Sequence, residues 1–109
     1  MLNSDIRLPC NMTSPSKHDS IALILWYRDE SGDPIYSIDA RSTDDIKTAE
    51  HFISEQFLNR TEINLIYPIS FLSIRNLKQS DHGDYRCRID FKRGRTVNRG
   101  LRLIVIGKY

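Results

Sequence analysis

The feature that most limits what this chain can fold into is a set of four elements at fixed spacing. Cys10 is followed 16 positions later by Trp26, and the motif Asp81-x-Gly83-x-Tyr85 leads directly to Cys87. The two cysteines are 77 positions apart and have strand-like, apolar neighbours rather than the Cys-x-x-Cys spacing of metal and redox sites. We expect a buried disulfide, worth about 4 to 5 kcal/mol in the chain-entropy model.

Together, these elements resemble the core of an immunoglobulin domain. There the disulfide joins two sheets, the indole packs on the sulfurs, and the tyrosine bonds back to the corner before its strand. The resemblance predicts an all-β, two-sheet Greek-key sandwich. The 61 positions from Trp26 to Cys87 leave room for extra central strands, which favours a variable-type or intermediate domain over the constant type. Only a short stretch precedes Cys10, so we expect the first strand to be clipped.

The rest of the chain has the pattern of short strands. Apolar runs recur between turn signals at intervals of roughly 8 to 14 residues, without a sustained helical period. Ser31, Gly32 and Asp33 predict a hairpin turn, and Gly94 predicts another. The polar segment Ser42–Glu50 could be an edge strand, a loop or a helical turn. The expected strands are a first one with Ile6, Leu8 and Cys10 pointing inward, then Ile21–Arg28, Pro34–Asp39, Phe52–Thr61, Ile69–Ile74, Tyr85–Phe91 and Thr96–Ile106.

Length and composition indicate one folded domain covering residues 1–109. A chain of 109 residues with 39% hydrophobic and 28% charged residues suits a single core and is not typical of disorder. The longest apolar run, Ile21–Tyr27, is far shorter than the roughly 20 residues that span a bilayer. No secretory signal is visible, so the chain is either cytosolic or an excised mature domain with an initiator Met. The cysteines favour the second alternative, an extracellular address.

A more specific resemblance lies in the block Leu25–Arg41, which is similar to the first domain of the sidestep family of insect neuronal cell-surface proteins. Leu8–Cys10 and Tyr85–Phe91 share it, and it weakens between Ser42 and Ile66. The resemblance implies a plasma-membrane-anchored protein with several extracellular domains. Its N-terminal domain would bind immunoglobulin proteins of the beaten path family during axon guidance and synaptic matching.

Strand alternation predicts where a partner would bind. If Trp26 and Cys87 point inward, their neighbours point outward from the sheet of strands C, F and G. Apolar and aromatic side chains flanked by arginines are typical of protein interfaces. Alternatively, the face is solvated and its charges pair among themselves and with Asp39, although exposed ion pairs contribute only about 0 to 1 kcal/mol. The candidate partner-binding residues are Leu23, Leu25, Tyr27, Tyr36, Arg86, Arg88, Asp90, Arg93 and Arg95.

Charge is distributed unevenly along the chain. Arg86–Arg102 holds seven basic residues and one acid, whereas Asp29–Asp45 holds six acids and one base. The net charge of +2 does not support nucleic-acid binding, but the basic run keeps a salt-sensitive polyanion or heparin site open as an alternative. Homophilic adhesion, or a weak homodimer through the same face, is also open.

Two N-x-Ser/Thr sequons also point to an extracellular address. Asn11 and Asn59 begin them, and both are expected to face solvent from the sheet opposite the binding face. Arg60, inside the second sequon, either forms an ion pair with Asp81 or is solvated.

No pattern in the sequence indicates catalysis. Nucleophile, zinc-protease and phosphate-loop motifs are absent, and His18, His51 and His82 lie in separate polar stretches without metal-ligand spacing. The tandem acids Asp44 and Asp45 would diverge on a strand. We therefore expect no enzyme activity, no metal, no cofactor and no direct membrane contact by this domain.

Overall fold

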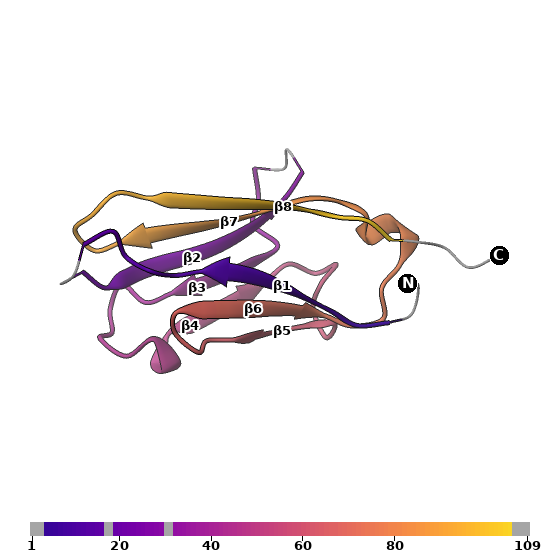
Figure 1. Cartoon of the computed structure of the whole chain (residues 1–109). Coiled ribbons are helices and arrows are strands. Elements are labelled where there is room, and N and C mark those ends of the chain that lie inside the picture. Colours follow the sequence, from indigo (N-terminus) through magenta and orange to yellow (C-terminus); the bar gives the residue numbers. More distant parts are fainter. Residues whose placement is uncertain (1–3, 17–18, 30–31, 106–109) are drawn as a thin grey trace.

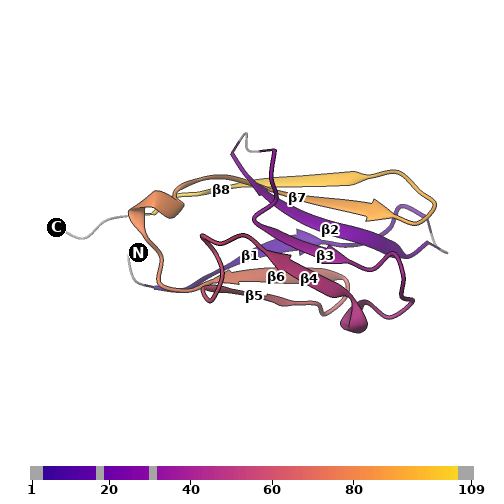
Figure 2. The same ribbon diagram turned by 180° about the vertical axis from the view of Figure 1, so that it is seen from behind.

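The computed structural model describes residues 4–16, 19–29 and 32–105, which form two antiparallel sheets packed face to face (Figures 1 and 2). One sheet has three strands in the order β1-β6-β5, and the other has five in the order β4-β3-β2-β7-β8. Ser31 and Ile106, expected in a turn and at the end of the last strand, lie outside the described residues. The strands are β1 (Ile6–Asn11), β2 (Ile21–Arg28), β3 (Tyr36–Asp39), β4 (Glu50–Ile53), β5 (Thr61–Asn64), β6 (Ile69–Ile74), β7 (Gly83–Phe91) and β8 (Val97–Leu103).

The sheet order confirms the predicted two-sheet, variable-type topology. Strands β2, β7 and β8 occupy the places of C, F and G, and β3 and β4 extend their sheet as the additional central strands do. Strands β1, β6 and β5 occupy the places of B, E and D. Among the described residues no strand precedes β1.

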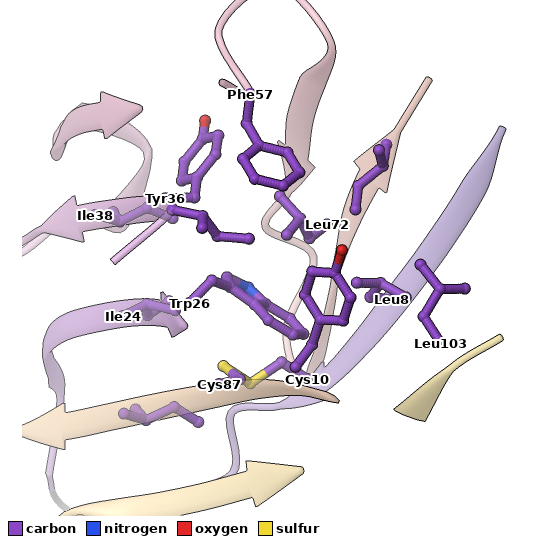
Figure 3. Close-up of a cluster of buried hydrophobic side chains, with 14 of the residues drawn as sticks. Leu8, Cys10, Ile24, Trp26, Tyr36, Ile38, Phe57, Leu72, Cys87 and Leu103 are labelled. Atoms are coloured by element: carbon purple, nitrogen blue, oxygen red, sulfur yellow. A yellow bond between two sulfur atoms is a disulfide. The ribbon is translucent and has the colours of Figure 1, made fainter. Parts of the chain in front are cut away.

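The predicted core elements meet between the two sheets (Figure 3). A disulfide joins Cys10 of β1 to Cys87 of β7, one strand from each sheet, and the Trp26 side chain is fully buried beside it. The hydroxyl of Tyr85 donates a 2.6 Å hydrogen bond to the backbone oxygen of Asp81. A buried indole removes a large apolar surface from water, so this cluster is the centre of the core.

Asp81 also anchors the end of the sandwich where β7 begins. Arg60 and Asp81, with side chains 15% and 3% exposed, form an ion pair with an Nη2–Oδ2 distance of 2.5 Å. Of the two alternatives left open for Arg60, the structure shows the ion pair. Gly83 follows with a φ of +154°, and a Cβ there would lie 2.6 Å from Oδ1 of Asp29. The motif therefore requires glycine at this position for both backbone and steric reasons.

In two segments the structure decides or corrects a prediction. Ser42–Glu50, which could have been an edge strand, a loop or a helical turn, contains a short 3-10 turn, η1 (Ile46–Thr48), capped by Asp45, before β4 begins. The expected single strand Phe52–Thr61 is wrong. The chain leaves the five-stranded sheet after Ile53 and enters the three-stranded sheet at Thr61, and one strand cannot belong to both. A turn with Phe57 buried in the core joins them.

The two ends of the sandwich differ in what they carry. The start of β1, the end of β8 and the 3-10 turn η2 (Gln79–Asp81) lie at one end, and the β7–β8 turn and η1 lie at the other (Figure 1). In the β7–β8 turn, the backbone nitrogens of Arg93 and Gly94 donate to the carboxylate of Asp19.

No helix in the described part of the chain has the length and apolar character that a bilayer crossing needs.

Candidate functional site

The outer face of the five-stranded sheet, on the side away from the core, carries three rows of side chains set by strand register. Residues paired across antiparallel strands project from the same face. We use the name "outer face" for these rows. The central row is Phe52, Ser37, Leu25, Arg88 and Asn98; one neighbouring row is Glu50, Asp39, Leu23 and Asp90, and the other is Tyr27, Arg86 and Gly100.

Most of the predicted binding residues are brought together here. Leu23 and Leu25 are half-buried in the middle of the sheet, and Arg86, Arg88 and Asp90 lie beside them on β7. Their positions follow from the alternation set by inward-pointing Trp26 and Cys87. Strand alternation was therefore sufficient to place these five residues on one face.

Tyr27 lies on this face but is less accessible than expected. Its side chain is 9% exposed, because the Arg86 guanidinium carbon stacks 4.7 Å from the ring centroid. Arg86 itself is exposed and forms no ion pair within the described residues. In this row the guanidinium of Arg86 is therefore the exposed group, and the Tyr27 ring packs beneath it in a cation–π contact.

Arg88 and Asp90 form a fixed ion pair on β7. Arg88 Nε lies 3.0 Å from Asp90 Oδ1, and the hydrogen bond to Asp90 raises the pKa of Arg88. Asp90 Oδ1 also accepts a 2.7 Å hydrogen bond from the Thr96 hydroxyl. The Thr96 hydroxyl therefore helps to hold the orientation of the pair.

Two further pairs flank the outer face. Arg41 donates to Asp39 through Nε and Nη2 at 3.0 and 2.8 Å, and these bonds lower the pKa of Asp39 to about 2. Arg102 Nε donates to Asp84 at 2.8 Å and lowers its pKa in the same way. Asp39 and Asp90 on the outer face, and Asp84 beside it, are thus each paired with an arginine, whereas Glu50 on the face is exposed and forms no ion pair among the described residues.

Three predicted residues do not lie on the outer face. Tyr36 is paired with inward-pointing Trp26, so its ring is 4% exposed in the core, where burial raises its pKa and its hydroxyl contacts His51 Nδ1 at 2.7 Å. Its assignment to the binding face is wrong. Arg93 and Arg95 are exposed in the β7–β8 turn, beyond the last row. They could contact a partner only at the end of the sheet.

Sequence reasoning missed two members of the outer face. Phe52, on edge strand β4, is 55% exposed and pairs with Ser37. Gly100 pairs with Arg86 on β8. Phe52 was missed because the predicted strand Phe52–Thr61 had the wrong boundaries. Gly100 could have been identified, because a glycine inside an alternating strand often marks a close approach of another backbone.

The two sequons lie away from this face. Asn11 is the last residue of β1 and Asn59 lies in the turn before β5, both exposed on the side of the three-stranded sheet. Their glycosylation remains a prediction. Among the described residues, no group of three or more histidine, cysteine or acidic side chains is placed to hold a metal ion.

The two-sheet topology, the inter-sheet disulfide and the packed indole define an immunoglobulin-type domain of variable topology. The chain matches the family model described as immunoglobulin V-set domain over residues 1–106, and it belongs to that family. Domains of this family are typically extracellular, and they generally act as cell-surface recognition modules rather than enzymes.

The solved structures support the fold independently. The chain is similar to a structure titled as murine CRIg, with a TM-score of 0.73 and 18% sequence identity, covering 97% of this chain and 88% of the other. At this identity the likeness concerns the fold alone. No curated protein sequence matches the chain.

Proposed function

We propose that this domain binds an immunoglobulin-superfamily protein through the outer face, and that the partner is heterophilic and of the beaten path type. The domain would be the extracellular recognition module of a plasma-membrane-anchored protein acting in axon guidance and synaptic matching. The partner class rests on the similarity of Leu25–Arg41 to the sidestep family. The use of this face rests on its geometry.

The observation that carries the proposal is the central row. Phe52 is 55% exposed beside Ser37 and half-buried Leu25, and Arg88 continues the row on β7. Phenylalanine, like the other aromatic residues and arginine, is enriched at protein interfaces. Arginine is also among the residues most enriched at hot spots, which lie near the centre of an interface. Asn11 lies on the opposite sheet and Asn59 in the turn that leads into it, so glycans there would leave the row uncovered.

The alternatives have less support. In the basic run, Arg88, Lys92 and Arg102 are each paired with a carboxylate, which weakens the case for a polyanion site. A polyanion complex would also lose affinity steeply as salt rises, with little dependence on Phe52 or Leu25. Homophilic adhesion would use the same residues, so it is tested by including this domain among the partners.

The test compares two arginines of matched exposure, Arg88 on β7 of the five-stranded sheet and Arg75 directly after β6 of the three-stranded sheet. Arg88 and Arg75 have side chains 42% and 43% exposed, and each contacts one carboxylate, Asp90 and Glu62 respectively. Binding is measured by surface plasmon resonance against soluble beaten path ectodomains and against the domain itself. We expect Arg88→Glu to lower affinity about tenfold or more and Arg75→Glu to change it less than about twofold. Equal effects of the two variants, or no binding to any of these proteins, would contradict the proposal.

A further inference from the structure

Gly100 is a glycine that the domain's own fold does not require. It lies inside β8, and its φ is outside the left-handed region. A Cβ added there would meet only the backbone oxygen of Tyr85, at 3.9 Å, which is an ordinary van der Waals contact. Glycine inside a strand is destabilising because it orders a flexible backbone and adds no packing. The packing of the described residues therefore does not require glycine at this position.

Two other glycines show the contrast. A Cβ on Gly83 would lie 2.6 Å from Oδ1 of Asp29, and one on Gly94 would lie 2.7 Å from Oδ2 of Asp19. Both glycines make room for side chains of this chain that hold backbone nitrogens. Gly100 makes room on the outer face, where no described part of the chain fills the space.

Gly100 lines an open hollow of about 400 Å³ over β7 and β8. Its lining includes Asp29, Asp84, Arg86 and Asn98. The two carboxylates are already paired, Asp84 with Arg102 and Asp29 with Arg28. Arg86 is the lining group whose charge has no ion-pair partner in the described chain, and its stacking on Tyr27 holds the guanidinium in place.

We propose that Gly100 is the point where the partner backbone approaches this domain most closely, and that the partner places a carboxylate side chain in the hollow against Arg86. This inference rests on the proposed function and names the chemistry of its partner. Because glycine has no Cβ, the backbone of another chain can approach the strand more closely at that residue. A guanidinium that is already oriented loses less side-chain freedom when it forms a charge-assisted bond to a carboxylate.

The charges of the outer face do not by themselves choose between a different protein and a second copy of the chain. Asp39 and Asp90 on this face, and Asp84 beside it, each pair with an arginine. Glu50, also on the face, is exposed and forms no ion pair among the described residues, so a second copy could offer that carboxylate to Arg86. The choice of a different protein therefore rests on the proposed function, and the experiments below include the domain itself as a partner.

The first experiment fills the hollow in steps. Gly100→Ala and Gly100→Val are compared with Ser73→Val, which adds a similar side chain on the outward side of β6 in the other sheet. Affinity for soluble beaten path ectodomains is measured together with the melting temperature of each variant. We expect Gly100→Val to lower affinity about tenfold or more, with Gly100→Ala intermediate and Ser73→Val unchanged. The melting temperature of Gly100→Val should equal or exceed that of the parent, because a β-branched residue suits a strand.

The second experiment tests the charge. Arg86→Gln keeps a polar side chain of similar shape but removes the guanidinium, and Arg86→Lys keeps the charge without the planar fork. We expect a loss of about tenfold or more for Arg86→Gln, smaller for Arg86→Lys, with the difference shrinking at high salt. Unchanged binding by Arg86→Gln would overturn the carboxylate assignment.

The outcomes separate this inference from the proposed function. If Gly100→Val binds normally while Arg88→Glu does not, the close approach at Gly100 is refuted and the outer face still stands. If neither variant loses affinity, or no beaten path ectodomain binds the parent, both are refuted. Binding of the domain to itself that is lost in Gly100→Val would retain the close approach and overturn the choice of a heterophilic partner.

Discussion

The guanidinium of Arg86 covers the ring of Tyr27 at 4.7 Å, so that an aromatic side chain on the outward side of β2 is 9% exposed. The contact joins β2 to β7 on the side of the sheet away from the core, where the two residues are paired in register. It has two effects. The Tyr27 ring contributes to the packing between β2 and β7, and Arg86 is the exposed member of the pair.

Substitution of Tyr27 is accordingly expected to change stability as well as binding. Tyr27→Ala should lower the free energy of unfolding by about 2 kcal/mol, the value typical of uncovering a large apolar side chain. Leu23→Ala, at a half-buried position on the same strand, should cost less. Urea unfolding followed by tryptophan fluorescence measures both. Equal stability of Tyr27→Ala and the parent would show that the stacked arrangement does not exist in solution.

The part-buried ion pair between Arg60 and Asp81 is expected to contribute to the unfolding free energy. Asp81→Ala leaves Arg60 unpaired in a site where the two side chains are 15% and 3% exposed, and we expect a loss of about 3 kcal/mol in unfolding free energy. The matched control is Asp84→Ala, whose carboxylate is 59% exposed and pairs with Arg102. That variant should lose much less unfolding free energy than Asp81→Ala, because solvent screens an exposed pair. A similar loss in both would contradict the buried character of the Asp81 site.

The buried hydroxyl of Tyr85 should make the domain sensitive to alkaline pH. Burial raises the pKa of Tyr85 to about 12 from 10.0. Since the folded state holds this proton more tightly than the unfolded state, the associated stability is complete below pH 10 and is lost as pH rises towards 12.

Tyr85→Phe checks this expectation. Removing the hydroxyl bond to Asp81 should cost about 1 kcal/mol at neutral pH and should make the decline between pH 10 and 12 shallower. Because the pKa of Tyr36 is also raised, some decline should remain. Chemical unfolding across that pH range gives the comparison, and an identical decline in parent and variant would count against the raised pKa of Tyr85.

The sequence alone predicted correctly which strand residues face the core and which face solvent, wherever a residue that must point inward lies in the same strand. Cys10, Trp26 and Cys87 set which side of each strand faces the core. From them, the outward positions of Leu25, Arg88 and their neighbours follow without any knowledge of distant contacts. The tyrosine corner likewise depends on residues close together in the chain.

The errors arose where the position of a residue depends on its partner in another strand or sheet. The inward direction of Tyr36 is set by its pairing with Trp26, and no local pattern specified that register. The break between β4 and β5 arises because the chain changes sheets, which the apolar pattern of Phe52–Thr61 does not reveal. The low exposure of Tyr27 depends on a side chain from another strand.

The most direct test of the outer face is an NMR titration of the isotope-labelled domain with a beaten path ectodomain that binds it. We expect the backbone amide signals of β2, β7 and β8, and the signal of Phe52 on β4, to shift or broaden as the complex forms. Those of β1, β5 and β6 should stay in place. Changes confined to β1, β5 and β6 would contradict the account.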